Sequence, residues 1–500
     1  MTRLAGSRWL FGLGCVLVTG GVGIHLPMFL MARDMGYRLA GMAVDGAMVA
    51  GMAAIVGGVV LAAIGLLPPA EQPGAPMLEV TTPDDLPLGR AHWRLMGALV
   101  LALVIDVMKP ASLGFTVPGM AAEYGLPKHA VALLPFSALT GTVLGSLAWG
   151  ALADRYGRRA TIMLSAVMFV GTSICGAMPS FAWNVGMCLM MGLAAGGMLP
   201  VAYALLAEMM PWRHRGWALV MVGGLGAAGG YAVASLLSAF LQPVFGWRIL
   251  WLANLPTGLL LVLLGPLIPE SARFLAAHGR KAEAIAVLAR FGAVARSAAS
   301  PEALEDERTL GHAGLFLALS VAGLAWGWAN FGVLLWLPAD LVARGLPVGA
   351  ASALIAKSAL IAVPTTVVAA SVYVRWSARA TLVATIAVML AGLVLLLRVT
   401  AAGGNPLLPV ALVLVGTNGI IAVLLPYAAE SFALRVRGRA TGWIAACTKA
   451  GGLAAQVMGL AGLVLSVPTA TAALLLPTLL ALALVLAYGP RPAAPRPLAA

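Results

Sequence analysis

Charged side chains are scarce in this sequence: Asp, Glu, Lys and Arg make up only 10% of its 500 residues, whereas hydrophobic residues make up 61%. The mean hydropathy is +0.97. Apolar runs repeatedly reach the roughly 20 residues that a helix needs to cross a bilayer, and a soluble core has no use for so many. The lack of charge therefore excludes an ordinary soluble protein and predicts a polytopic, all-α membrane protein.

Cysteine is rare as well. The four cysteines are scattered within apolar runs and lack the spacing of metal ligands, so we expect packing residues and no metal site. The sequence also contains no nucleotide-binding loop and no local cluster of a nucleophile with a base. No cofactor is expected, and a membrane enzyme is the least favoured class of function.

Acidic residues are outnumbered, with 18 Asp and Glu against 31 Lys and Arg and a formal net charge of +13. In a soluble protein this excess would suggest a nucleic-acid partner. Here the basic residues cluster in short segments between apolar runs, which is the pattern of membrane topology. With both termini in the cytoplasm, only a few basic side chains lie outside, namely Arg33, Arg38, Lys128, Arg248, Arg344 and Arg398. We therefore predict cytoplasmic termini, a cell-membrane location and no nucleic acid.

Fourteen apolar segments divide the chain. Two of them, at 9–31 and 42–67, form a predicted N-terminal hairpin over 1–67, and a proline-rich cytoplasmic linker follows at 68–94. We expect a first six-helix half over 95–268, a cytoplasmic interdomain loop with short amphipathic helices over 269–311, a second half over 312–488 and a tail over 489–500. The twelve core spans are predicted at 95–118, 129–149, 160–178, 182–208, 217–240, 247–268, 312–337, 348–374, 380–399, 406–429, 439–464 and 468–488.

A repeated motif supports two homologous halves. The fourth core span ends in Glu208, followed by Arg215-Gly216, and the tenth ends in Glu430, followed by Arg437-Gly438. The offset is 222 residues throughout. Equivalent motifs at equivalent helix ends indicate an internal duplication.

The most unusual stretch is GALADRYGRR, from Gly150 to Arg159, between two apolar runs. It holds one acid and three arginines in ten residues. We expect a loop of only a few residues, in which Gly150 and Gly157 permit a tight backbone. Asp154 can accept hydrogen bonds from Arg158 or Arg159 across it.

This order of residues resembles the signature loop between helices 2 and 3 of the major facilitator superfamily. The segment PESARFLAAHGRKAEA, which starts at Pro269, is similar to one found in its sugar-porter, organic-ion and aromatic-acid branches. The resemblance covers about 95–488 and leaves the hairpin unexplained. It implies two six-helix halves that alternate access to a central site, in a protein that works as a monomer.

The resemblance also implies a cytoplasmic gate, a charge network that holds the outward-open state and breaks when the halves rock. Its expected members are Gly150, Asp154, Arg155, Gly157, Arg158, Arg159, Glu208, Arg215, Glu270 and Arg273, with Glu430, Arg435 and Arg437 as equivalents in the second half.

Four ionisable residues lie near the predicted membrane midplane, about 13–21 Å along their helices at about 1.5 Å per residue: Asp106, Lys109, Lys357 and Lys449. Such residues cost about 2.5–3.5 kcal/mol each to insert and are usually functional. Asp106 and Lys109 share a helix face and could pair, which leaves Lys357 and Lys449 without an acidic partner. We interpret the three lysines as a site for an anion and Asp106 as the proton-coupling residue.

The aromatic-acid:proton symporters carry D-x-x-D in the first helix, where this chain has Asp106-x-x-Lys109. The change from acid to base weakens an assignment to that subfamily. Trp326, Asn330 and Asn418 could stack on or hydrogen-bond to a substrate, although each is equally explained by helix packing.

The favoured hypothesis is a secondary active transporter that couples import of a small carboxylate-type anion to protons. The alternative is a drug or metabolite:proton antiporter, suggested by fourteen spans and by the glycine-rich run 223–230. Fourteen-helix exporters, however, carry their extra pair between the halves. A third hypothesis is a non-transporting receptor that binds a partner through its hairpin, which the intact gate motifs disfavour.

Overall fold

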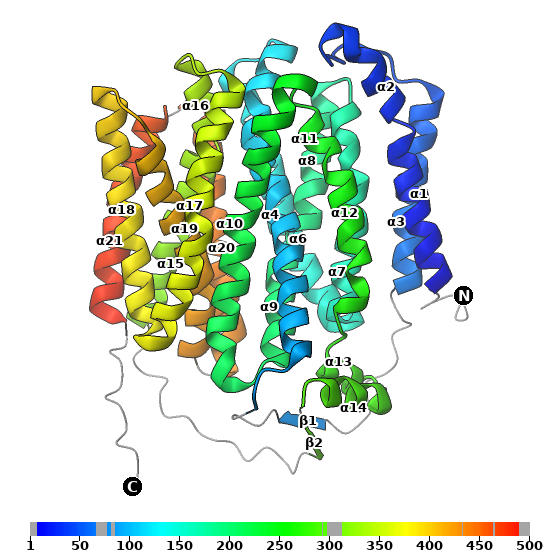
Figure 1. Cartoon of the computed structure of the whole chain (residues 1–500), viewed down its shortest axis with the longest axis vertical. Helices are drawn as coiled ribbons and strands as arrows, with labels where there is room; N and C mark the ends of the chain where they lie inside the picture. The colour runs from blue at the N-terminus through cyan, green and yellow to red at the C-terminus, as the bar shows by residue number, and fades with distance from the viewer. Residues whose placement is uncertain are drawn as a thin grey trace.

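The computed structural model describes residues 8–66, 78–81, 86–292, 294–297, 313–432, 434–463 and 466–489. Within these ranges, thirteen helical segments are long and apolar enough to span a membrane. A further helix, α20 (Leu434–Leu460), stands among them (Figure 1). The prediction of an all-α polytopic membrane protein is confirmed.

The first six-helix half begins at Arg90, five residues earlier than predicted, because α4 continues below the apolar run. Its elements are α4 (Arg90–Tyr124), α5 (Lys128–Val131), α6 (Leu133–Tyr156), α7 (Arg158–Gly171), η2 (Thr172–Ala177), α8 (Phe181–Ala195), α9 (Met198–Met209), α10 (Trp212–Phe245), α11 (Ile249–Leu252), α12 (Asn254–Leu263) and η3 (Gly265–Leu267). Several predicted spans are thus built from two or more shorter helices. The third consists of α7 and η2, and the sixth consists of α11, α12 and η3.

The second half repeats this arrangement. Its elements are α15 (Ala313–Trp328), the π-helical η5 (Ala329–Leu334), α16 (Leu337–Ala343), α17 (Val348–Arg375), α18 (Ala378–Ala402), α19 (Leu407–Ser431), α20 and α21 (Val467–Tyr488). Glu208 and Glu430 fall in the last turn of α9 and α19, as the internal repeat requires.

The halves meet along α10 and α17, which small side chains allow to pack closely. A Cβ built on Gly224 would lie 2.4 Å from the Thr366 methyl group, so a larger residue there would separate the helices. Nearer one end, the hydroxyl groups of Ser238 and Ser352 are 2.8 Å apart. The close fit provides a continuous seam between the halves.

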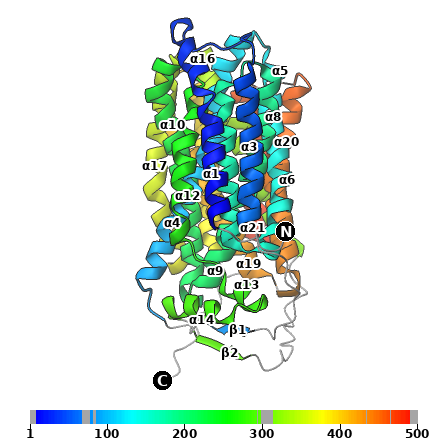
Figure 2. The ribbon, with the colours of Figure 1, turned by 90° about the vertical axis from the view of Figure 1, so that its right-hand side faces the viewer.

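The N-terminal hairpin consists of α1 (Arg8–Gly23), α2 (Leu26–Met31), η1 (Ala32–Met35) and α3 (Gly46–Leu66). Figures 1 and 2 show α1 and α3 upright against one side of the bundle, where they pack on α7. A Cβ on Gly14 would lie 2.5 Å from the carbonyl oxygen of Gly58, so glycine is what permits this helix pair.

A carboxylate ties the hairpin to the first half. Glu123, at the end of α4, accepts hydrogen bonds from the backbone N–H groups of Leu39 (2.8 Å) and Ala40 (3.0 Å). It also accepts the indole N–H of Trp247 (2.8 Å) and pairs with the fully buried Arg248 at 2.7 Å. This cluster could not be predicted from the sequence, because Leu39, Glu123 and Arg248 are far apart in the chain.

On the opposite end of the bundle, the linker reaches the interdomain segment. Strand β1 (Leu78–Thr81) pairs antiparallel with β2 (Val294–Ser297), beside α13 (Ala272–Ala277) and α14 (Lys281–Arg290). The two short interdomain helices were predicted. The acidic run near 301–308 lies outside the described residues.

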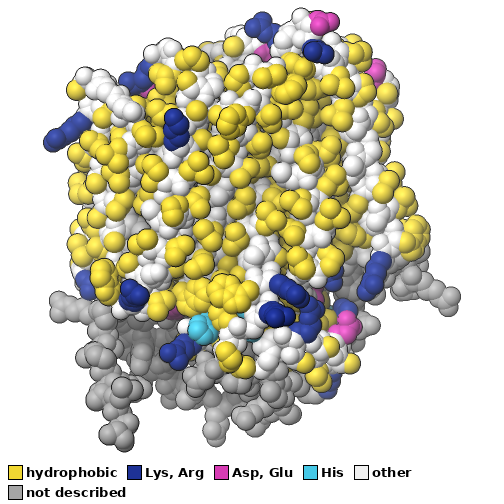
Figure 3. Space-filling view, in the orientation of Figure 1, with side chains coloured by type: hydrophobic (Ala, Val, Ile, Leu, Met, Phe, Trp, Pro, Cys, Tyr) yellow, Lys and Arg dark blue, Asp and Glu magenta, His cyan; other side chains and the backbone are white. Residues whose placement is uncertain are grey.

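Charged side chains gather toward the two ends of the face shown in Figure 3, and hydrophobic side chains cover the band between them. This distribution is that of a protein immersed in a bilayer. We call the end that carries Gly150–Arg159, α13 and α14 the loop side, and the opposite end the far side.

Candidate functional site

A cavity of about 580 Å³ lies between the two halves. The first half contributes α4, α6, α8, α9 and α10 to its wall, and the second half contributes α15, η5, α19 and α20. Its size falls within the roughly 300–1,000 Å³ of small-molecule sites. Of the residues predicted to act at a substrate site, it brings together Asp106, Trp326, Asn330, Asn418 and Lys449.

Asp106 reaches the cavity from the middle of α4. It is only 6% exposed, and its Oδ1 atom has no hydrogen-bond partner. Pro110 follows one turn later inside the same helix. Because proline has no N–H, it cannot donate the helical hydrogen bond to the Asp106 carbonyl. The helix thus offers both an unsatisfied carboxylate oxygen and a weakened backbone at the cavity wall.

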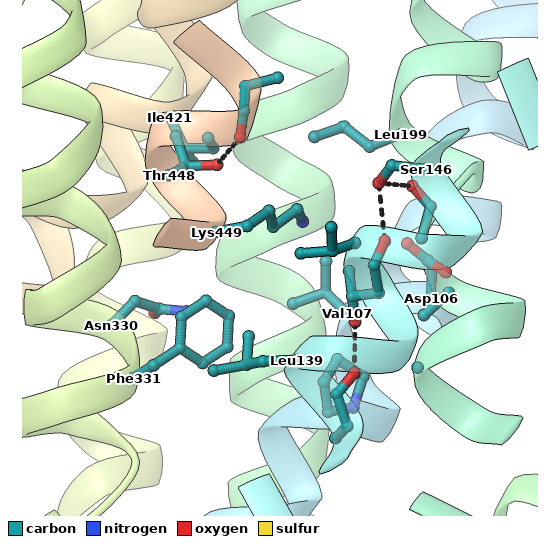
Figure 4. Close-up of a pocket in the computed structure, with 18 of the residues that line it drawn as sticks. Asp106, Val107, Leu139, Ser146, Leu199, Asn330, Phe331, Ile421, Thr448 and Lys449 are labelled. Atoms are coloured by element: carbon teal, nitrogen blue, oxygen red, sulfur yellow. Dashed lines mark hydrogen bonds between the residues drawn. The ribbon is translucent and has the colours of Figure 1, made fainter. Parts of the chain in front are cut away.

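Lys449 extends from α20 on the other side of the cavity (Figure 4). The two side chains do not form an ion pair within 4.0 Å. Lys449 thus has no direct acidic partner, and Asp106 lies across the cavity from it, with a space between them that a bound group could enter.

Local helix geometry positions the polar residues of the second half. Asn330 and Phe331 belong to the π-helical turn η5, and Leu335 donates its backbone N–H to the Asn330 carbonyl five residues earlier. Such turns widen a helix and often occur at functional sites. Trp326 lines the same wall and donates its indole N–H to the Thr417 carbonyl (2.9 Å).

Two buried polar groups at the cavity lack partners. The amide Nδ2 of Asn418 was among the predicted residues, and the hydroxyl of Tyr203 on α9 was not. Tyr203 lies over Gly223 of α10, where a Cβ would be 1.7 Å from its hydroxyl oxygen. Buried polar groups normally find a partner, so both atoms are candidates to bind a ligand. The available signal was Gly223, in the glycine-rich run that, from the sequence, suggested only an antiporter.

Lys109 does not line this cavity. Its ammonium group is fully buried within the first half, where it donates to the carbonyl of Phe169 (2.6 Å) and to the hydroxyl of Thr172. These contacts join α4 to the C-terminal end of α7, where the helix dipole favours a positive charge. The predicted pairing of Lys109 with Asp106 is therefore wrong, because Lys109 and Asp106 have different neighbours.

Lys357 is also outside the cavity. It is exposed on α17, on the outer surface of the bundle. Sequence depth along a helix placed it near the midplane, but depth does not determine which face of the helix a side chain occupies. Of the three predicted lysines, only Lys449 lines the cavity.

The far side of the cavity is closed by contacts between the halves. A Cβ on Gly114 would lie 2.5 Å from the Leu335 carbonyl oxygen, and the Tyr231 hydroxyl donates to the Leu334 carbonyl (3.0 Å). Toward the loop side, by contrast, the wall includes exposed residues such as Leu147 and Ala446. The cavity therefore opens toward the loop side.

The predicted gate loop is shorter than expected. Helix α6 continues to Tyr156, so Gly150, Asp154 and Arg155 are helical, and α7 begins at Arg158. Gly157 alone makes the turn, with φ of +103°, which explains why it is glycine. The expectation that Gly150 is a turn residue is wrong.

Arg158 is the centre of the charge network. Its guanidinium lies 3.3 Å from Glu208 and 3.3 Å from Asp154. The Asp154 side chain is 79% exposed and that of Glu208 only 12%, so the pair with Glu208 is the better shielded. Glu208 also accepts the hydroxyl of Ser271. These contacts join α6, α7, α9 and the start of α13, all within the first half.

Glu270 caps the start of α7. One of its oxygens accepts the backbone N–H groups of Arg158 (2.7 Å), Arg159 (3.2 Å) and Ser271 (2.9 Å). Burial raises the pKa of Glu270, and these backbone hydrogen bonds oppose the rise. A carboxylate at a helix N-terminus is favourable, and here it fixes the turn at Gly157.

The remaining predicted gate residues are placed as follows. Arg273 is exposed, and Arg155 lies over the ring of Tyr156. The Arg215 guanidinium lies over the ring of Trp212. Glu430 contacts Tyr373 and approaches Gly216 of α10, across the seam between the halves. The side chains of Arg435 and Arg437 lie outside the described residues.

Comparisons with known proteins agree with this architecture. Residues 99–455 match the sequence profile of the Major Facilitator Superfamily. The chain is 26% identical over 389 residues to the niacin transporter of Acinetobacter baylyi, covering 75% of this chain and 88% of that protein. It is 33% identical over 211 residues to the 4-hydroxybenzoate transporter of Pseudomonas putida, covering 40% of this chain and 45% of that one.

The match to the 4-hydroxybenzoate transporter thus spans less than half of that protein's length. Among solved structures, the fold is similar to the xylose transporter of E. coli in a partially occluded, inward-open conformation. The TM-score is 0.64 at 16% identity, covering 81% of this chain and 99% of that one.

Proposed function

Because the chain belongs to the major facilitator superfamily, and is thus a membrane transporter and not an enzyme, we propose that it carries a small organic anion by proton-coupled symport. The observation that carries the proposal is the pair of opposed charges in the cavity. Lys449 supplies a cation from the second half, and Asp106 supplies a titratable carboxyl from the first.

The chemistry of the wall favours a carboxylate on a single ring. Apart from a few polar atoms, the cavity is lined by apolar and aromatic side chains, including Trp326 and Phe331. A carboxylate at Lys449 would form a charge-assisted hydrogen bond, and a flat ring would lie against the aromatic wall. Relatives named for niacin and 4-hydroxybenzoate, both carboxylates on one ring, support this class. Asn330 and Asn418 would orient the remaining polar groups.

Coupling follows from the positions of the two side chains on opposite walls of one cavity. An anion bound at Lys449 neutralises the positive charge of that side chain. Asp106, buried and without a partner at one oxygen, carries the proton that crosses with the substrate. Substrate and proton then cross together, because neither charge is left unpaired in the low-dielectric interior.

The alternation of access uses the seam between the halves. The far side is packed and the loop side open, so this conformation faces the loop side, which we propose is cytoplasmic. The Arg158 network is formed in this conformation and joins elements of the first half alone. In place of a lock on the outward-open state, its role in the proposal is to keep the first half rigid while it rocks against the second. Glu430 meets the first half at Gly216. Both termini would be cytoplasmic in the cell membrane, with the monomer as the working unit. We keep the division of the chain predicted from the sequence as a proposal, with the start of the first half moved to Arg90.

Uptake by proteoliposomes tests the proposal. Purified protein is reconstituted, an inward proton gradient is imposed, and accumulation of radiolabelled nicotinate and 4-hydroxybenzoate is compared with that of a cationic dye. We expect at least one aromatic acid to accumulate and the accumulation to collapse with a protonophore. Efflux of the cation driven by the same gradient, with no anion uptake, would instead support a drug antiporter.

A further inference from the structure

A second cavity lies on the loop side, where α4 leaves the membrane. It measures about 180 Å³ and is lined by Ala91, Arg94, Leu267, Pro269, Arg290 and Phe291. Its two charged residues are both arginines, brought from different parts of the chain. Nothing in the proposed transport cycle uses them.

The two arginines are held close together by the fold. Arg94 belongs to the first turns of α4, and Arg290 ends α14 in the interdomain segment. Phe291 is buried and packs edge-on against His92 of α4, with ring centroids 5.1 Å apart. This contact fixes the end of α14 on α4, so the arginines cannot separate without breaking it.

Two cations at one cavity repel each other unless an anion lies between them. No carboxylate among the described residues forms an ion pair with Arg94 or Arg290. The dipole of α14 favours a cation at its C-terminus and explains Arg290 alone. It does not explain why Arg94 lines the same cavity.

The surroundings identify the kind of anion. Leu267 lines the cavity and is 46% exposed, and Leu260 and Leu263 of α12 continue an exposed apolar face along the same helix side. Trp93, exposed on α4, pairs with Trp217 at 6.1 Å, as aromatic side chains do at the level of lipid headgroups. The cavity is thus charged at its mouth and apolar toward the membrane.

We propose that this cavity binds the phosphate headgroup of an anionic phospholipid in the leaflet on the loop side. Arg94 and Arg290 donate to the phosphate oxygens, since guanidinium groups match phosphate geometry. The acyl chains lie along Leu263 and Leu267. The lipid thereby links α4, a helix of the transport cavity, to the interdomain segment.

Native mass spectrometry of the full-length protein in detergent tests this site, titrated with phosphatidylglycerol, phosphatidylcholine or inorganic phosphate. We expect one phosphatidylglycerol to bind more tightly than phosphatidylcholine. Arg94→Gln with Arg290→Gln should weaken that binding about 30-fold, or about fivefold for each arginine. The double Arg94→Lys, Arg290→Lys variant should bind with intermediate affinity, because it keeps the charge but loses the guanidinium geometry.

Lys281→Gln is the matched control, since it removes one exposed positive charge from the other end of α14. It should change phosphatidylglycerol binding less than twofold. Equal weakening by Lys281→Gln would show only a general attraction to the basic surface and would overturn the site. Equal binding of the two lipids would also overturn it, as would unchanged binding in the double Gln variant. Displacement of the lipid by millimolar inorganic phosphate would identify a soluble-anion site instead. All of these readouts are independent of transport.

Discussion

Replacing Lys449 with glutamine tests the role of its positive charge while leaving the shape of the cavity nearly unchanged. Gln keeps an unbranched polar side chain of similar reach, so the wall of α20 changes little. The positive charge opposite Asp106 disappears. We expect the variant to fold, because the substitution removes a partly buried positive charge that has no ion-pair partner, and this removal does not lower stability.

The expected loss of affinity follows from the position of Lys449. Lys449 is half-buried in the cavity wall, across from Asp106 and without a direct ion pair. Its ammonium group is therefore available to a ligand. A hydrogen bond to a charged group contributes about 1.5–3 kcal/mol. At about 1.4 kcal/mol per decade, an anionic substrate should bind roughly 10- to 150-fold more weakly.

Quenching of tryptophan fluorescence provides the assay, because Trp326 lines the cavity and responds to a ring bound beside it. Lys357→Gln is the control. It removes the same charge from a similar depth, but from an exposed position outside the cavity, and should change the Kd less than twofold. The reasoning is refuted if the Kd of Lys449→Gln stays within twofold of the wild type, or if the two variants weaken binding equally.

Four further outcomes are expected. Asp106→Asn should abolish accumulation driven by a pH gradient in proteoliposomes but spare substrate exchange; retained accumulation would exclude it as the proton carrier. Tyr203→Phe should raise the Kd about two- to tenfold for a substrate with a second polar group and leave plain benzoate unaffected, as measured by the same fluorescence titration. Glu208→Gln should lower the melting temperature in detergent more than Asp154→Asn, since Asp154 is 79% exposed and its ion pair is screened by water; the reverse order would contradict the central role of Arg158. Glu123→Gln should speed hydrogen exchange at Leu39 and Ala40, and unchanged exchange would show that the hairpin is held by its helices alone.

The class of the protein could be read from the sequence because it depends on local properties. Runs of apolar residues long enough for a bilayer require helices, and the Glu-to-Arg-Gly repeat located the ends of α9 and α19. The GALADRYGRR stretch identified the superfamily. Even so, it gave the wrong local structure, since helix α6 continues through Gly150 and only Gly157 turns the chain.

The candidate site could be predicted only in part. Spacing along a helix gives depth, so four midplane charges were found. It does not give the rotation of each helix within the bundle, which is set by packing against neighbours. Lys357 consequently lies on the outside, and Lys109 is used to join α4 to α7. Lys449 alone lines the cavity, opposite an acid that the sequence had assigned to another partner.

Contacts between distant segments were decided by the tertiary structure alone. The tie from Glu123 to the hairpin, the strand pair of the linker with the interdomain segment, and the cavity shared by Arg94 and Arg290 all join residues that lie more than 80 positions apart. Sequence periodicity does not connect such residues, because it reports only the local helix, strand or turn that each segment forms. The sequence by itself determined the helices, their approximate ends and the family. The tertiary structure decided which side chains of different helices face one another. The rotation of each close-packed helix depends on its contacts with all of its neighbours, which is a property of the whole bundle.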